Sequence, residues 1–568
     1  MQNVLRVNLT TGAITTEPLP ERYARLAGRA LSSRLVADEV PATCEPLGPR
    51  NKLVFTCGYF AGTALTSAMR TSVGGKSPLT GTIKESNAGG TVSMRLAQHG
   101  YRALILEGEA PEGTLQLLHI TKQGARLLPA DEYRGLGNIA LAERLRARFG
   151  ERVAFATIGP AGEYLYNASA IAHSDADGRA SRISARGGLA AVMGRKGLKA
   201  IVLDEVKGYV PKPVRADLWR QGQRTYTEIV NTHPATKIYR EVGTSAMVRV
   251  MQGHGGLPTR NYRDGRFELF ENLSAETFVK HITERGGNPT HACMPGCIIR
   301  CSNVYPDEHG QELVSPVEFE TIGMMGSNLG IGDLDTVARL NRVCNDLGLD
   351  TIEMGVTLGV AMEAGLLPFG DGEGALRLLD EVGRGTILGR LLGAGALITG
   401  KTLGVRRIPH VKGQGLPAYE PRAMKALGVT YCTSPMGGDH TAGHTVRFTN
   451  DHRNAAEAVE VSRRAQLLFT LFDCLGVCIF AVPQMRERLD VLAQAVSGLM
   501  GFEIDPAGLE QLALDTLRVE RTFNRAAGFT PVHDRLPEWL VDEVLPSTGT
   551  TFDVNPEEMD RIFAHAGF

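Results

Sequence analysis

Residues 1–205 contain short apolar or alternating runs, each bounded by Gly, Pro or Asp. This pattern is typical of β-strands, because successive side chains of a strand point to opposite faces. We predict strands at residues 4–9, 52–56, 103–107, 115–120, 152–158 and 200–203. Residues 206–213 (VKGYVPKP) have the composition of a linker. The first part of the chain is therefore predicted to be rich in β-structure.

Beyond the linker, apolar residues recur at three- and four-residue spacing, which is typical of one face of a helix. We predict helices at residues 333–347, 352–366, 374–392 and 457–472. A stretch rich in Pro and Gly at 411–421 (VKGQGLPAYEP) marks the predicted start of a third domain. No internal repeat of 20 to 50 residues is visible.

Residues 467–483 (LLFTLFDCLGVCIFAVP) are strongly apolar and raise the question of a membrane span. The run is at the lower limit of length for a span, carries Asp473 near its middle and ends in proline. We therefore predict a buried helix that ends inside the protein.

Composition and charge narrow the class of protein. A length of 568 residues predicts three or four domains, and 43% hydrophobic with 22% charged residues excludes disordered and collagen-like chains. The net charge of -1 gives no reason to expect nucleic acid or an anionic membrane as a partner. The N-terminus lacks the apolar segment of a secretory signal, so we expect a cytoplasmic protein.

Three of the nine cysteines lie within nine residues, with the spacing C-x3-C-x3-C. Cys293, Cys297 and Cys301 could hold three corners of a [4Fe–4S] cluster, whose fourth ligand must come from elsewhere in the chain. Cys474 and Cys478, in the apolar run, are the candidates. The alternatives are a structural zinc site, which usually uses paired C-x2-C units that are absent here, or reduced core cysteines. Radical-SAM enzymes use a different spacing.

Glycine-rich segments at 70–81 (RTSVGGKSPLTG), 85–90 (ESNAGG) and 184–196 form a second set of candidates. Each combines backbone freedom with an Arg or Asn, a combination that suits phosphates and a heterocycle. None has the register of a Walker loop. The alternative interpretation is a set of tight turns with solvated charges.

Taken together, ordered motifs along nearly the whole chain resemble the aldehyde:ferredoxin oxidoreductase family, whose members carry tungsten or molybdenum on two pyranopterins. The motifs lie at residues 3–12, 76–81, 187–189, 256–261, 318–321, 348–351 and 473–478. The resemblance implies an α+β fold, in which a β-rich saddle domain at 1–205 lies under two pterins. Two mainly helical domains, at 206–407 and 408–568, would close over them.

The resemblance also implies a set of cofactor contacts. Arg70, Asn87, Gly89 and Arg186 would contact pterin from the glycine-rich segments. Each helical domain would add a D-x-x-G-[LV]-x motif, with these further contacts: Asn345, Leu349, Asp350, Asp473 and Ile479. Cys478 would be the fourth cluster ligand and Cys474 a core thiol. A magnesium ion between the pterin phosphates belongs to the same expectation.

The chain departs from the family pattern at four positions. The first two cluster cysteines are separated by one extra residue, which a loop can absorb. Asn345 stands where the family usually has aspartate and cannot carry its charge. Arg339 stands where founding members hold a metal between subunits, so we predict no such metal. Gln414 replaces an expected glutamate.

Glu320 and His440 align with the family's glutamate and histidine beside the metal. Without the resemblance, a capping or surface glutamate and a structural histidine are the ordinary interpretations. His444, four residues further on, is the second choice for the imidazole. His440 would hydrogen-bond the carbonyl oxygen of an aldehyde, and Glu320 would take a proton from the attacking water.

The implied reaction is oxidation of a small aldehyde to a carboxylic acid, with electrons passing to ferredoxin or an iron–sulfur partner subunit. A homodimer is a further expectation. Three alternatives stay open: a low-potential reductase of the same cofactor family, similar to the benzoyl-coenzyme A reductases; a non-catalytic electron-transfer subunit; and a zinc-stabilised scaffold.

Overall fold

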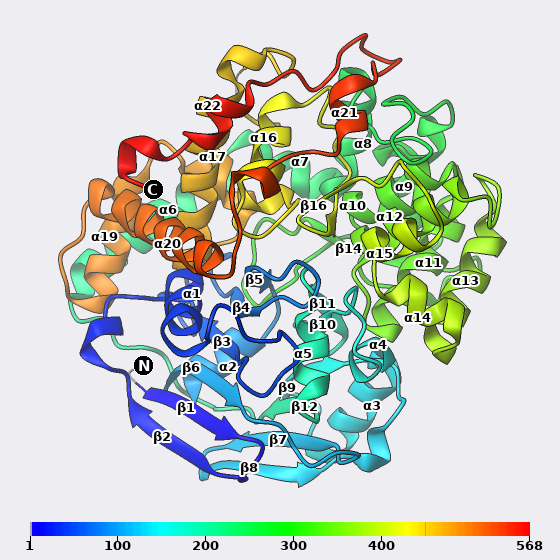
Figure 1. The fold of residues 1–568 in the computed structure, drawn as a ribbon. Coiled ribbons are helices and arrows are strands. Elements are labelled where there is room, and N and C mark those ends of the chain that lie inside the picture. Colours follow the sequence, from blue (N-terminus) through cyan, green and yellow to red (C-terminus); the bar gives the residue numbers. More distant parts are fainter. Residues whose placement is uncertain (1–2, 449) are drawn as a thin grey trace.

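The computed structural model describes residues 3–448 and 450–568 (Figure 1). The strands of the N-terminal third form one side of the molecule, and helices of the remaining two thirds cover them. This arrangement confirms the predicted α+β class, with a β-rich region followed by mainly helical structure. Residues 1, 2 and 449 lie outside the described part of the chain.

The N-terminal region contains two six-stranded sheets of identical topology. The strands of the first are β1 (Asn3–Asn8), β2 (Ile14–Pro18), β3 (Leu53–Cys57), β4 (Thr71–Lys76), β5 (Ile83–Ala88) and β6 (Tyr101–Glu107), in the order β2-β1-β6-β3-β4-β5. Those of the second are β7 (Gln116–Thr121), β8 (Gly124–Pro129), β9 (Ala154–Ile158), β10 (Ile171–Ser174), β11 (Ala180–Ser184) and β12 (Leu198–Leu203), in the order β8-β7-β12-β9-β10-β11.

In each sheet only the pair of first and last strands, β1 with β6 and β7 with β12, is parallel. A helix follows the first hairpin in each half: α1 (Gly28–Glu39) or α3 (Asn138–Phe149). The six predicted strands correspond to β1, β3, β6, β7, β9 and β12. The structure therefore contains a repeat much longer than the 20 to 50 residues searched in the sequence.

Most of the first glycine-rich segment is a strand and not a flexible segment or a set of tight turns. Residues 71–76 form β4, which pairs with β5 over its whole length. Its glycines allow close packing: a Cβ on Gly74 would lie 3.0 Å from Ser32 Cβ of α1, and one on Gly75 would lie 2.9 Å from the Lys52 carbonyl oxygen. The segment at 184–196 does contain a loop, in which Gly187 and Gly188 have φ of 91° and 71° before α5 (Leu189–Arg195).

Three of the predicted helices are present as α11 (Leu334–Leu347), α12 (Thr351–Glu363) and α17 (Ala455–Leu475). The fourth prediction, one helix at 374–392, is wrong. The chain forms α13 (Gly372–Arg384) and α14 (Ile387–Gly393) instead. Gly385 ends α13 with φ of 67°, and Thr386 caps α14 by accepting a hydrogen bond from the Gly389 N–H at 3.1 Å. Helical periodicity continues across this break, so it does not reveal the cap.

The apolar run at 467–483 contains the end of a buried helix, as predicted. Helix α17 ends at Leu475, because Gly476 adopts a left-handed conformation with φ of 72°. A short 3-10 helix, η8 (Ile479–Ala481), follows it. Among the described residues, no helix has the length and apolarity that crossing a membrane requires.

Helix α6 (Ala216–Thr232) packs closely against α19 (Leu489–Met500), since a Cβ on Gly498 would lie 2.4 Å from the Trp219 amide nitrogen. Their side chains share one apolar cluster with the cysteine-rich loop. The two helical segments are therefore interleaved, and the division at 407/408 stays a prediction.

Two helix ends meet the two halves of the N-terminal region. A Cβ on Gly58, just after β3, would lie 2.3 Å from the Leu475 carbonyl oxygen at the end of α17. A Cβ on Gly159, just after β9, would lie 2.3 Å from the Leu347 carbonyl oxygen at the end of α11. Only glycine permits such contact, so both helix ends rest directly on the backbone of the sheets.

Candidate active site and metal centre

A cavity of about 320 Å³ lies between the N-terminal region and the two helix ends. It brings together most of the residues singled out in the sequence. Those that line it are Arg70, Gly89, Cys293, Cys301, Glu320, Asn345, Asp350, His440, Cys478 and Ile479. Asn87, Arg186 and Leu349 are not part of its wall, but each is next in sequence to a residue that is. Cys297 borders a neighbouring groove, and Asp473 lines neither.

The four predicted cluster ligands are buried and come from two parts of the chain. Cys293, Cys297 and Cys301 are on one loop, and Cys478 precedes η8. The two parts meet at Ser67, which accepts a hydrogen bond from the Cys478 N–H at 2.8 Å and lies 3.3 Å from Cys297 Sγ through its hydroxyl. Burial raises the pKa of Cys301 and of Cys478 above the ordinary thiol value.

The spacing of these thiols suits a group larger than one ion. In the described part of the chain, no three cysteine sulfurs lie within 4.8 Å of one another. A tetrahedral zinc site with 2.3 Å bonds would bring them to about 3.8 Å. Four buried thiols on two converging segments match in number and kind the ligands of a [4Fe–4S] cluster. Cys474 lies apart, 3.5 Å from the Thr516 hydroxyl, and burial raises its pKa to about 12.

On the first sheet, the predicted pterin contacts bind one another. Arg70 donates to the Asn87 carbonyl oxygen at 3.0 Å and also to its side-chain oxygen. The Asn87 amide in turn donates to Glu85 at 3.1 Å. Gly89 faces the cysteine loop, because a Cβ there would lie 3.2 Å from Cys293 Sγ. The first sheet thus joins the predicted cofactor contacts to the predicted cluster.

Asp473, in the last turn of α17, belongs to a buried charged group that sequence analysis missed. Arg29 of α1 makes a bidentate ion pair with Glu520, with distances of 2.9 and 2.8 Å, and lies 3.4 Å from Asp473. Burial and the neighbouring Glu85 carboxyl raise the pKa of Asp473 to about 8. Burial also raises the pKa of Glu85, and two neighbouring buried carboxyl groups favour one shared proton.

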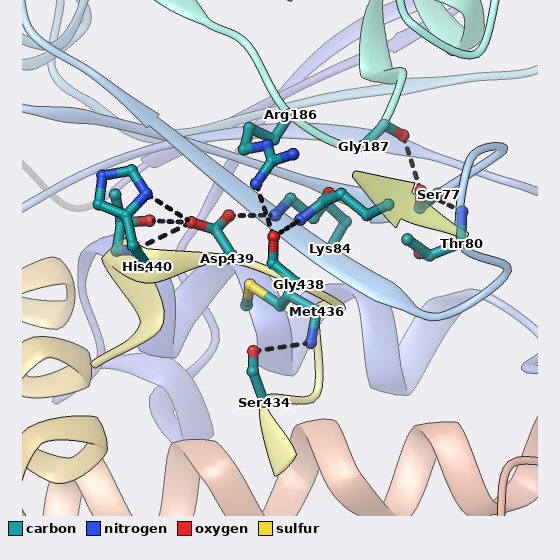
Figure 2. A network of polar contacts seen from close by, with 12 residues as sticks. Ser77, Thr80, Lys84, Arg186, Gly187, Ser434, Met436, Gly438, Asp439 and His440 are labelled. Atoms are coloured by element: carbon teal, nitrogen blue, oxygen red, sulfur yellow. Dashed lines mark hydrogen bonds and ion pairs between the residues drawn. The ribbon is translucent and has the colours of Figure 1, made fainter. Parts of the chain in front are cut away.

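At the second helix end, Arg186 is held by the protein. It donates to the Gly438 carbonyl oxygen at 2.6 Å (Figure 2). It also donates to Asp350 at 3.2 Å and to the Gly415 carbonyl oxygen. Asp350 also caps α12 through the Ile352 N–H at 3.0 Å. Arg186 therefore fixes the position of Asp350, which does line the cavity.

Asn345 and Leu349 flank Gly348 at this helix end. The Asn345 side chain lines the cavity and has no hydrogen-bond partner among the described residues, as a group that reads the polar edge of a ring requires. Leu349 is buried, and its backbone forms an isolated β-bridge with Ser169, two residues before β10. Its predicted contact with a pterin stays a prediction.

The two predicted proton-transfer residues lie together, although they are far apart in the sequence. Glu320 Oε1 and His440 Nε2 are 3.1 Å apart, and Glu320 Oε2 accepts a hydrogen bond from the Ala418 N–H at 2.9 Å. The Nδ1 atom of His440 is buried without a hydrogen-bond partner in the described chain. A carboxylate and an imidazole therefore share one wall of the cavity.

Asp439 and Lys84 lie behind His440 and form a buried ion pair of 3.0 Å, visible in Figure 2. Although burial alone would raise it, Lys84 and Arg186 lower the pKa of Asp439 well below its usual range. The resulting carboxylate lies 3.9 Å from His440 Nδ1. Lys84 lies between the glycine-rich segments at 70–81 and 85–90, and this position is the only feature of the sequence that could have marked it as a site residue.

His444, the second choice for the imidazole, also lines the cavity, with its ring centre 5.8 Å from that of His440. Burial and the nearby charges of His440 and Arg447 lower the pKa of His444 well below its ordinary value. Its contacts are with the rings of Tyr419 and Phe469. It is therefore a neutral, ring-packed group, whereas His440 faces a carboxylate.

The structure also shows the surroundings of Arg339 and Gln414, the two remaining departures from the family pattern. Arg339 lies on the exposed face of α11 and pairs with Glu373 at 2.5 Å. Gln414 is buried, donates to the Gly438 carbonyl oxygen at 3.2 Å and lies near Arg186. The absence of an intersubunit metal stays a prediction.

Comparison with known proteins places these features in a family. The family profile "Aldehyde ferredoxin oxidoreductase, N-terminal domain" matches residues 4–205, and "Aldehyde ferredoxin oxidoreductase, domains 2 & 3" matches residues 221–565. The tungsten-containing aldehyde ferredoxin oxidoreductase of Pyrococcus abyssi is 30% identical over 96% of this chain and 92% of its own. The enzyme of the same name from Pyrococcus furiosus is 29% identical, over 95% and 91%.

Two more distant proteins are also similar. The aliphatic sulfonate oxidoreductase, WOR-like subunit, of Pyrococcus furiosus is 25% identical over 91% of this chain and 85% of its own. The solved active-site complex BamBC of benzoyl coenzyme A reductase, bound to 1,5-dienoyl-CoA, has the same fold, with a TM-score of 0.82 at 19% identity over 100% of this chain and 94% of that one. The two profiles together span most of the sequence, and the chain belongs to the aldehyde ferredoxin oxidoreductase family.

Proposed function

We propose that this oxidoreductase converts an aldehyde into a carboxylic acid. The aldehyde carbon gains an oxygen atom from water, and two protons and two electrons leave. The observation that carries the proposal is the 3.1 Å pair of Glu320 and His440 in a cavity that also contains predicted cluster thiols. The names of the relatives with about 30% identity support the same reaction.

The proposed cofactors are tungsten, or molybdenum, on two pyranopterins, and one [4Fe–4S] cluster. Arg70, Asn87, Asn345 and Asp350 fit the pterins because they present guanidinium, amide and carboxylate groups in or beside the cavity. When bound, the metal supplies a Lewis acid and a two-electron acceptor. A magnesium ion between the pterin phosphates is part of this proposal.

Two side chains of this chain would handle protons and orientation. His440 donates a hydrogen bond to the aldehyde oxygen, which makes the carbonyl carbon more electrophilic. Glu320 accepts a proton from the attacking water, and the Ala418 N–H holds its other oxygen in place. Asp439 is a positioning residue, since its carboxylate faces His440 from behind.

The electrons would leave on the side of Cys297, the cluster thiol that borders an open groove. Arg240 and Arg300 line this groove. Arg300 is exposed, and Arg240 is anchored by the Ile298 carbonyl oxygen at 2.6 Å. Two cations above a cluster suit an acidic ferredoxin or an iron–sulfur subunit, because opposite charges speed association. A homodimer is part of the same proposal.

The test is metal analysis followed by turnover. The enzyme should contain tungsten or molybdenum and about four irons per chain, as one cluster requires. It should reduce a viologen dye when given a simple aldehyde. Glu320→Gln keeps shape and hydrogen bonding but removes the base, so kcat should fall about 10²- to 10⁴-fold with metals retained. Near-normal turnover would remove Glu320 from the mechanism.

His444→Ala is the matched control and should lose much less activity than His440→Ala. The reverse result would assign the catalytic imidazole to His444. Dye-driven reduction of an aromatic thioester without any aldehyde oxidation would show a low-potential reductase instead. Loss of all redox metals in favour of zinc would show a scaffold.

A further inference from the structure

Arg447 and Arg70 of the cavity wall both lack a carboxylate partner among the described residues, but Arg70 donates two hydrogen bonds to Asn87 whereas Arg447 donates none to an oxygen atom. Arg447 follows the segment that carries His440 and His444, and its guanidinium lines the cavity. It lies 4.8 Å from the centre of the Tyr239 ring, and one of its nitrogens is 3.8 Å from the sulfur of Met247. Within residues 3–448 and 450–568, no carboxylate oxygen lies within 4.0 Å of it.

The other arginines of the cavity wall are bound more fully. Arg70 donates to Asn87, and Arg182 donates to Ser302 at 2.7 Å and lies 3.9 Å from Asp175. Arg486 supports Arg447 directly, because it donates to the Arg447 carbonyl oxygen at 3.2 Å. Its own carboxylate neighbour, at 3.7 Å, is a largely exposed glutamate. Two adjacent cations thus occupy one side of the cavity.

Much of the remaining cavity wall is aromatic. The rings that line it belong to Tyr239, Phe319, Tyr419, Phe448, Phe469 and Phe480. The ring of Tyr419 lies 5.4 Å from the His440 ring and 4.9 Å from the His444 ring, and the ring of Tyr239 lies 4.8 Å from the Arg447 guanidinium. Aromatic rings therefore lie beside the proton-transfer pair and beside the arginine, and a flat apolar molecule in the cavity can pack against both.

We propose that Arg447, backed by Arg486, binds an anionic group of the substrate, an aldehyde with a flat apolar body and a second, negatively charged end. This inference rests on the proposed aldehyde oxidation and names its substrate class. The planar fork of an arginine matches a carboxylate or a phosphate through two parallel hydrogen bonds. A neutral substrate would leave the cation unpaired in a partly dry cavity, which is unfavourable.

The experiment compares two aldehydes of similar shape, 4-formylbenzoate and 4-methylbenzaldehyde, by viologen reduction. In the wild type, kcat/KM should favour 4-formylbenzoate. Arg447→Gln should reduce this preference about 10- to 100-fold, mainly by raising KM, as loss of a charge-assisted hydrogen bond predicts. Arg447→Lys should give an intermediate loss, because it keeps the charge without the fork. 4-Formylphenyl phosphate, tested in parallel, shows which anion is preferred.

Arg488→Gln is the matched control. Arg488 is two residues from Arg486, but it is exposed and pairs with Asp490 at 3.0 Å. The ratio of kcat/KM for the two aldehydes in Arg488→Gln should equal that of the wild type. Equal loss of preference in Arg488→Gln and Arg447→Gln would show a general charge effect and overturn the assignment.

A binding measurement separates this inference from the proposed function. Calorimetry on the isolated holoenzyme should show that terephthalate binds more tightly than 4-methylbenzoate, and that Arg447→Gln removes the difference. This result requires no turnover, so it can stand even if no aldehyde is oxidised. Identical affinities in the wild type would overturn the anion site. Loss of pterin or tungsten from Arg447→Gln would also overturn it and assign Arg447 to the cofactor.

Discussion

The two helix ends that meet the N-terminal sheets use the same backbone device with different chemistry. Gly348 ends α11 with φ of 74°, and Gly476 ends α17 with φ of 72°. Each end presses against a glycine that follows the third strand of its sheet, Gly159 or Gly58. The repeated sheets thus provide two equivalent contact positions for a helix end, one at Gly159 and one at Gly58. The two positions, called seats below, differ in the side chains that each helix end carries.

The difference lies in charge and in sulfur. At the second sheet, Asn345 is neutral and Asp350 is paired with Arg186. At the first sheet, Asp473 shares a buried charged group with Arg29, and Cys478 faces the other cluster thiols. Under the proposed function, the two equivalent helix ends would each hold one pterin, and only the first would lie beside the four cluster thiols.

The largest expected effect comes from removing the thiol that makes the two ends unequal. Cys478→Ser should abolish the cluster, because the other three thiols cannot close its fourth corner. Visible absorption and iron content measure the loss. Cys474→Ser is the control, since Cys474 is buried beside Thr516 away from the other thiols, and it should keep the cluster. If the cluster survives in Cys478→Ser and is lost in Cys474→Ser, then Cys474 is the fourth ligand and Cys478 is the core thiol.

The next effect tests whether the two seats are equivalent. Gly58→Ala and Gly159→Ala each place a methyl group 2.3 Å from a carbonyl oxygen, so the helix end must shift. Overpacking of this kind costs about 1–3 kcal/mol, and both variants should melt at lower temperature. Gly253→Ala is the control, because nothing lies within 4 Å of its added Cβ. An unchanged melting temperature in one of the two variants would show that the seats differ.

The smallest effect concerns the proton at Asp473. Its pKa is raised from 3.8 to about 8 by burial and by Glu85. Between these values the unfolded chain releases the proton while the folded protein keeps it, so this group makes stability fall as pH rises from about 4 to about 8. Asp473→Asn should flatten that part of the profile of melting temperature against pH. If Glu85→Gln flattens it instead, the shared proton belongs to Glu85.

Sequence pattern identified the strands whose side chains pack into apolar cores, such as β3 and β6. It missed β4 and β5. The reason is that β5 (IKESNA) carries Lys84 and Glu85, which are almost fully buried because they face charged partners on helical segments. A polar strand with buried charges has the composition of a loop, so periodicity alone cannot identify it.

The candidate site divides in the same way. The cysteine triplet is local in sequence, and its spacing alone indicated a metal centre. The pairing of Glu320 with His440 needed the family resemblance, and the structure then placed the two side chains together. Arg29, Glu520 and Arg447 had no local signal, because their roles depend on which charges the fold brings beside them.

The Arg29–Glu520 ion pair also has a consequence for how the protein is made. Its partners are 491 residues apart in the sequence. At a synthesis rate of about 5–20 residues per second, the ribosome needs roughly 25 to 100 s to produce the second residue after the first. During that time the N-terminal sheets can fold, but the surface that the C-terminal helices will contact is still exposed. The Arg29–Glu520 ion pair, and with it the contact between α1 and α20 (Pro506–Ala526), can therefore form only after α20 has been translated.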